Sequence, residues 1–190
     1  MYHYQKKIPN FLTLIRVALV PCLLLLVFTH KPPASGLSFT LFCLIAFTDY
    51  LDGYLARRWN VVTEFGAFLD PAADKILVIM LLVALVGDQA SLYFTIPSLI
   101  IIFRELFMTM LREYLARISM TDILAVDRLG KFKTACQMLT LALFLVPVQH
   151  PSCLVVAYIF LYITCVLTVI SLIKYMSKLW QSRSLPAFNH

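Results

Sequence analysis

Six long apolar segments, separated by short polar turns, restrict this chain to a small set of folds. They span about residues 10–29, 37–58, 67–87, 92–116, 131–148 and 152–174. Each is close to the roughly 20 residues that a helix needs to cross a bilayer. The chain is also 61% hydrophobic, well above the share in soluble domains. The pattern predicts an all-α integral membrane protein with six transmembrane helices, formed by a single domain over residues 1–190.

The basic residues predict how these spans are oriented. When six spans are drawn, every one of the 16 Lys and Arg residues except Lys31 falls on one side of the membrane or near that side's span ends. Such a bias predicts that both termini are cytoplasmic, with the polar and aromatic residues 1–9 lying along the inner interface. It also explains the net charge of +6 together with attraction to anionic lipids, so we expect no nucleic-acid partner.

Four aspartates occur within one short window of this apolar chain: Asp49, Asp52, Asp70 and Asp74. On helices, the first two lie about 60° apart and the last two about 40° apart, so two acidic stripes can face each other across a helical hairpin. Solvated charges at helix ends are the simpler interpretation, but the flanking residues 37–47 and 76–86 are almost wholly apolar. Facing carboxylates in a low dielectric repel each other. Hard divalent cations would relieve that repulsion, and a pair of them suits phosphoryl transfer.

The same window resembles the signature of the CDP-alcohol phosphotransferases, Asp-x-x-Asp-Gly-x-x-Ala-Arg-x8-Gly-x3-Asp-x3-Asp. Every fixed position matches, namely Asp49, Asp52, Gly53, Ala56, Arg57, Gly66, Asp70 and Asp74. The resemblance implies two divalent cations, Mg²⁺ or Mn²⁺, held by the four aspartates, with Asp74 also acting as the general base. It further implies a cytidine-diphosphate site lined by Asp52, Gly53, Ala56, Arg57 and Gly66. It suggests a homodimer.

Further motifs are similar to those of family members that transfer a phosphatidyl group from CDP-diacylglycerol to glycerol 3-phosphate. They are Pro9-Asn10-x-x-Thr13-x-x-Arg16, Arg104-Glu105, Leu111-Arg112-Glu113 and Gly130-Lys131-x-Lys133-Thr134. The similarity extends from the N-terminus to about Thr140. It implies a bacterial inner-membrane enzyme whose active site faces the cytoplasm and whose lipid substrate stays in the membrane. The acceptor phosphate would then be held by a basic cluster of Arg104, Arg112, Lys131 and Lys133.

Several alternatives stay open from the residues alone. Arg16 lies about two turns into an apolar helix, where it either snorkels to the interface or meets a phosphate or carboxylate inside the bundle. The basic segment around Gly130 serves either membrane topology or an anion site at a helix start. Serine, inositol phosphate or phosphatidylglycerol could replace glycerol 3-phosphate as the acceptor. The aspartates could instead form the filter of a divalent-cation transporter, although nearby arginines would repel cations, or the chain could be an inactive homologue.

Overall fold

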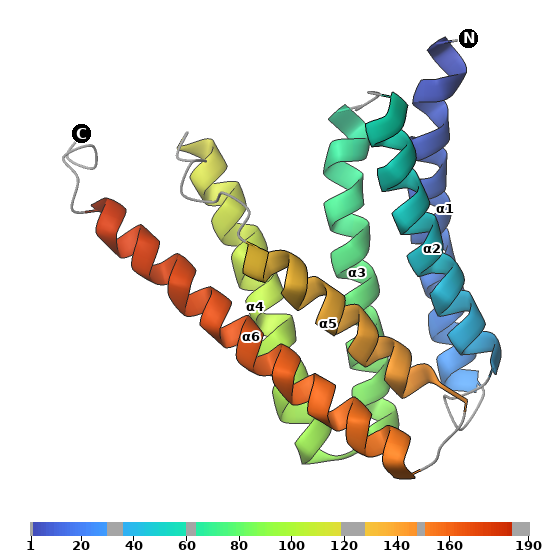
Figure 1. Cartoon of the computed structure of the whole chain (residues 1–190), viewed down its shortest axis with the longest axis vertical. Helices are drawn as coiled ribbons and strands as arrows, with labels where there is room; N and C mark the ends of the chain where they lie inside the picture. Colours follow the sequence, from blue (N-terminus) through green and yellow to red (C-terminus); the bar gives the residue numbers. More distant parts are fainter. Residues whose placement is uncertain (1, 30–35, 60–63, 119–127, 148–150, 184–190) are drawn as a thin grey trace. The chain divides into compact units, whose positions relative to one another are not determined.

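The structure is a computed structural model that describes residues 2–29, 36–59, 64–118, 128–147 and 151–183. Within these ranges all regular secondary structure is helical, and each predicted apolar segment corresponds to one helix (Figure 1). The six helices are α1 (Tyr2–Thr29), α2 (Gly36–Trp59), α3 (Glu64–Gln89), α4 (Leu92–Arg117), α5 (Arg128–Leu145) and α6 (Pro151–Arg183). The all-α prediction is therefore confirmed.

The helix boundaries differ from the predicted spans at several points. The predicted interfacial segment 1–9 and the first span belong to one helix, because α1 already begins at Tyr2. Helix α6 continues beyond the predicted end at residue 174 to Arg183. No glycine or proline interrupts residues 152–183, and a helix can continue past the apolar stretch when no such residue stops it. Hydropathy marks the apolar part of a helix and not its ends.

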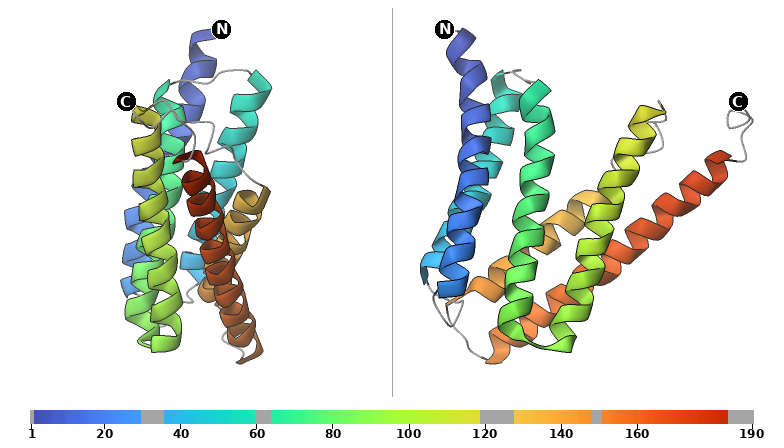
Figure 2. Two further views of the ribbon diagram at one scale, coloured as in Figure 1. Left: turned by 90° about the vertical axis from the view of Figure 1, so that its left-hand side faces the viewer. Right: turned by 180° about the vertical axis from the view of Figure 1, so that it is seen from behind.

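The helices form two compact units. The first contains α1, α2 and α3 together with the end of α5 and the first residues of α6. In this unit α1 packs against both α2 and α3, and the chain runs down α1, up α2 and down α3 (Figures 1 and 2). The core of this unit is aliphatic and aromatic, with fully buried side chains such as Leu23, Ile45, Leu77, Leu81 and Leu85.

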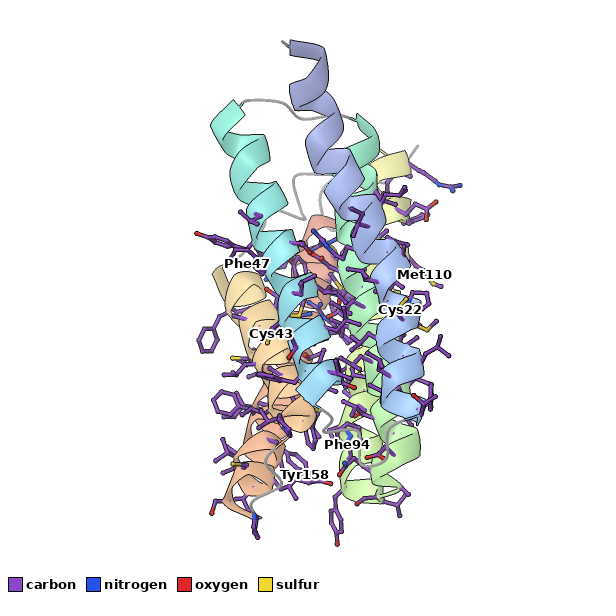
Figure 3. The ribbon with its side chains drawn as sticks, turned by 90° about the vertical axis from the view of Figure 1, so that its right-hand side faces the viewer. Cys22, Cys43, Phe47, Phe94, Met110 and Tyr158 are labelled. Atoms are coloured by element: carbon purple, nitrogen blue, oxygen red, sulfur yellow. The ribbon has the colours of Figure 1, made fainter. Side chains whose placement is uncertain are left out.

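The second unit contains α4, most of α5 and most of α6. Its buried positions follow helical spacing but include many polar side chains: Ser98, Arg104 and Glu105 of α4, Lys133, Gln137 and Thr140 of α5, and Thr164, Thr168 and Ser171 of α6. Thr140 and Thr164 are hydrogen-bonded at 3.1 Å. Near the start of α4, Phe94 and Tyr158 pack edge to face with ring centroids 6.4 Å apart (Figure 3).

Large apolar side chains lie on the outside of both units. Phe47 projects away from α2 (Figure 3), and Leu92, Tyr93 and Phe103 of α4 are at least 65% exposed. Among the described residues, two helices are long and apolar enough to cross a membrane, Leu92–Arg117 and Pro151–Gln181, and three shorter apolar stretches occur at Thr13–Thr29, Gly36–Leu51 and Phe132–Leu145. An apolar exterior around buried polar groups reverses the usual pattern of a water-soluble protein.

Candidate active site

The first unit brings Arg16, Asp49 and Asp74 to one level of the bundle through the lengths of its helices. Arg16 is as far from the end of α1 at Thr29 as Asp49 is from the start of α2 at Gly36. Asp49 is in turn as far from the end of α2 at Trp59 as Asp74 is from the start of α3 at Glu64. Because each residue adds the same rise along a helix, antiparallel neighbours place these three side chains side by side.

At this level the Arg16 guanidinium joins the two carboxylates. Arg16 Nη1 lies 2.6 Å from Asp49 Oδ1 and 2.9 Å from Asp74 Oδ1, and it donates a hydrogen bond to the latter. The Arg16 side chain is 0% exposed, whereas those of Asp49 and Asp74 are 38% and 43% exposed. Of the alternatives left open for Arg16, snorkelling is excluded by this burial and a carboxylate partner is found. We call these three residues the Arg16 triad.

The other predicted residues of the aspartate window lie in helices, but their contacts and surroundings fall outside the described part. This holds for Asp52, Gly53, Ala56 and Arg57 in α2 and for Gly66 and Asp70 in α3. Within the described residues, which do not include the Asp52 and Asp70 side chains, no group of three or more His, Cys, Asp or Glu side chains is placed to hold a metal ion. The predicted metal and cytidine-diphosphate assignments therefore stay predictions.

The two carboxylates of the Arg16 triad can nevertheless be compared with the ligands that a divalent cation requires. Carboxylate oxygens are the ligands that Mg²⁺ and Mn²⁺ prefer. Asp49 Oδ1, from the first half of the signature, and Asp74 Oδ1, from the second half, both lie close to Arg16 Nη1. The first and last aspartates thus converge around positive charge, and both are partly open to solvent. Their oxygen chemistry suits a divalent cation, and the positive charge that lies between them in this structure is that of Arg16.

The second unit contains a separate buried ionic cluster, which we call the Glu105 cluster: Arg104, Glu105, Lys133 and Ser171. The Glu105 carboxylate accepts from both Arg104 Nη1, at 3.2 Å, and Lys133 Nζ. Arg104 Nη2 donates to Ser171 Oγ at 2.8 Å. The three charged residues are each no more than 8% exposed. Arg104 and Glu105, which are adjacent in α4, thus face the interior of this unit and pair with each other.

The remaining members of the predicted basic cluster are placed differently. Arg112 is exposed near the end of α4, next in the chain to Glu113, which forms an exposed ion pair with Arg117 at 2.6 Å. The side chain of Lys131 lies outside the described part. Within the second unit the structure therefore brings Arg104 and Lys133 together, through Glu105.

Sequence reasoning missed two contacts of this unit. It did not predict that Lys133 shares Glu105 with Arg104, and it assigned nothing to Ser171. A signal for Ser171 was available, because Thr164, Thr168 and Ser171 follow one another at four- and three-residue spacing in the largely apolar stretch 153–173 of α6. Such a polar stripe indicates a helix face that packs against partners rather than lipid.

Comparison with known proteins decides the family. A model of the CDP-alcohol phosphatidyltransferase family matches residues 6–170. The chain belongs to this family. All of the predicted site residues, and both the Arg16 triad and most of the Glu105 cluster, lie within the matched range. The resemblance inferred from the aspartate signature is confirmed.

Individual members of the CDP-alcohol phosphatidyltransferase family match almost the whole chain. It is 40% identical over 170 residues to the CDP-diacylglycerol–glycerol-3-phosphate 3-phosphatidyltransferase of Haemophilus influenzae, covering 90% of this chain and 91% of the relative. It is 38% identical over 175 residues to the protein of that name from Wigglesworthia glossinidia brevipalpis, covering 92% and 96%. A third relative of that name, from Shigella flexneri serotype 5b, is 40% identical over 178 residues, covering 91% and 94%.

Proposed function

We propose that this chain transfers the phosphatidyl group of CDP-diacylglycerol to glycerol 3-phosphate and releases CMP. Relatives aligned over at least nine tenths of the chain are named for this transfer. The structural observation that supports it is the convergence of Asp49 and Asp74, from the two halves of the signature, at one level of the first unit. The sequence order of the signature alone does not require that convergence.

The proposed reaction is a direct displacement at phosphorus. A hydroxyl oxygen of the acceptor forms a bond to the β-phosphorus, the bond from that phosphorus to the CMP oxygen breaks, and the hydroxyl proton passes to the Asp74 carboxylate. Two divalent cations, Mg²⁺ or Mn²⁺, would be held by Asp49, Asp52, Asp70 and Asp74. When bound, these cations would supply positive charge that stabilises the diphosphate and the departing CMP.

The cytidine-diphosphate site would be lined by Asp52, Gly53, Ala56, Arg57 and Gly66. Positioning and electrostatics supply most of the rate.

We further propose that the acceptor phosphate is held by Arg104, Arg112, Lys131 and Lys133. The Glu105 cluster supports this assignment because one carboxylate faces two cations, which leaves a net positive charge in a buried place. Arg104 Nε has no hydrogen-bond partner among the described residues, so a donor is available there. Arginine also suits bidentate contacts with phosphate oxygens.

The setting that we propose is a bacterial inner membrane crossed by all six helices, with both termini and the active site on the cytoplasmic side. The apolar exterior of both units and the buried polar groups support embedding in lipid. The bacterial sources of the relatives support the compartment. We propose that the chain acts as a single catalytic domain, since the family match spans residues in both units, and that it forms a homodimer.

The proposed function is tested by CMP release from CDP-diacylglycerol in detergent with Mg²⁺. Glycerol 3-phosphate, serine, inositol phosphate and phosphatidylglycerol are added singly, each with an EDTA control. We expect release with glycerol 3-phosphate alone, abolished by EDTA. Release with a different acceptor would retain the displacement chemistry and overturn the assigned acceptor. No release with any acceptor would favour an inactive homologue or a cation transporter, which divalent-cation flux into liposomes would separate.

Replacing Arg112 with alanine tests the acceptor site, because its exposure on α4 makes a folding defect a minor concern. We expect the KM for glycerol 3-phosphate to rise about tenfold or more, the usual scale for losing a hydrogen bond to a charged group, with a smaller change for CDP-diacylglycerol. Arg117→Ala is the matched control, since it removes an exposed arginine of the same helix. Equal effects on both substrates would remove Arg112 from the acceptor site.

A further inference from the structure

Arg16 is the one fully buried charged side chain among the described residues of the first unit. Placing a guanidinium inside an apolar helical bundle is costly unless anionic partners surround it. Here Arg16 forms ion pairs with two aspartates of the signature, and both contacts end on a single atom, Nη1. A residue of the first helix thus holds together side chains of the second and third helices.

The geometry indicates what Arg16 does for these aspartates. Two carboxylates that approach one point repel each other, which favours separation or protonation of one of them. A guanidinium between them removes the repulsion and fixes where each oxygen lies. The same positive charge opposes the approach of any other cation to these oxygens, because charges only a few ångströms apart interact strongly in a partly buried site.

We propose that Arg16 is a positioning residue of the metal site, a resident counter-ion that sets the placement of Asp49 and Asp74 and limits their affinity for divalent cations. This inference rests on the proposed function, since it assumes that the two aspartates bind cations. It assigns Arg16 no contact with substrate. A site that must bind and release a charged diphosphate lipid benefits from metal binding that is not excessively tight, and a fixed positive charge provides that limit.

The charge contribution is tested with Mn²⁺ alone, without substrates, by titrating purified protein in detergent and following free Mn²⁺ by electron paramagnetic resonance. We expect Arg16→Gln to bind Mn²⁺ roughly tenfold or more tightly than the wild type, because the neighbouring positive charge is gone. Arg16→Lys retains the charge, so its Mn²⁺ affinity should stay within about threefold of the wild type. Arg117→Gln is the matched control, as it removes the same charge from an exposed pair.

The positioning contribution is tested by kinetics and by thermal unfolding of the same proteins. We expect kcat to fall about tenfold or more in both Arg16 variants, since small misplacements of reacting groups are costly, while the KM for CDP-diacylglycerol changes less. Without metal, Arg16→Gln should have a lower Tm than the wild type. Mn²⁺ should raise the Tm of Arg16→Gln more than that of the wild type, because a ligand that binds the folded state more tightly stabilises it more.

The outcomes separate this inference from the function on which it rests. If the wild type binds Mn²⁺ and Arg16→Gln binds it equally or more weakly, the counter-ion role is wrong and Arg16 is structural. If Arg16→Gln does not fold, Arg16→Lys decides: unchanged kcat with unchanged Mn²⁺ affinity would overturn the positioning role. If the wild type binds no Mn²⁺ and EDTA leaves its turnover intact, the metal site itself is wrong.

Discussion

Replacing Asp74 with asparagine is expected to abolish turnover while the protein still folds and inserts. The substitution keeps the shape and one oxygen of the side chain, so Arg16 can still donate a hydrogen bond to it. It removes the negative charge, and with it both the proposed proton acceptor and one proposed metal ligand. Loss of a general base alone costs about 10²–10⁴ in rate, and loss of a ligand adds to that. CMP release with Mg²⁺ and glycerol 3-phosphate measures the effect.

Asp88→Asn is the matched control for this experiment. Asp88 stands near the end of the same helix, where it accepts a hydrogen bond from Gln89 Nε2 at 3.1 Å. This control should leave CMP release unchanged. Asp70→Asn is expected to abolish turnover as Asp74→Asn does, because the signature assigns Asp70 to the same metal pair. Normal turnover in Asp70→Asn or in Asp74→Asn would overturn the two-metal mechanism.

The sequence predicted the helical architecture well and the helix ends poorly. Long apolar runs have one stable form in lipid or in a helical core, so each of the six segments became a helix. The ends are decided by capping and by local turn residues, not by hydropathy, which is why α1 begins before its apolar run and α6 ends well beyond residue 174. The grouping of helices into units also lies beyond hydropathy, because it depends on side-chain contacts.

The candidate site was predictable to a similar degree. Residue spacing predicted that the two acidic stripes could face each other, and Asp49 and Asp74 do converge. The partner of Arg16 could not be chosen from spacing, because a buried arginine and a snorkelling one have the same sequence environment. The Lys133–Glu105 pair could not be predicted either, because it joins residues 28 positions apart. The length of the connection between α4 and α5 does not determine which faces of the two helices pack together.

Replacing Glu105 with glutamine is expected to destabilise the protein more than removing any exposed charge of the second unit. The change leaves Arg104 and Lys133 buried next to each other without their shared carboxylate. Removing one partner of a buried ion pair typically costs about 3–5 kcal/mol, because the remaining charge is uncompensated. Thermal unfolding in detergent, followed by helical circular dichroism, should show a lower Tm for Glu105→Gln than for the wild type.

Glu113→Gln is the matched control, because Glu113 belongs to the same helix and pairs with Arg117 at the exposed surface. Exposed pairs contribute about 0–1 kcal/mol, so this variant should unfold almost as the wild type does. Equal stability losses in the two variants would show that Glu105 is not the counter-ion of a buried cluster.

Adding glycerol 3-phosphate to the same proteins gives a second measurement. If Arg104 and Lys133 face the acceptor, the phosphate of glycerol 3-phosphate replaces the missing carboxylate. It should then raise the Tm of Glu105→Gln more than it raises the Tm of the wild type. A smaller shift in the variant would mean that the two cations serve the fold alone and that Arg112 holds the acceptor without them.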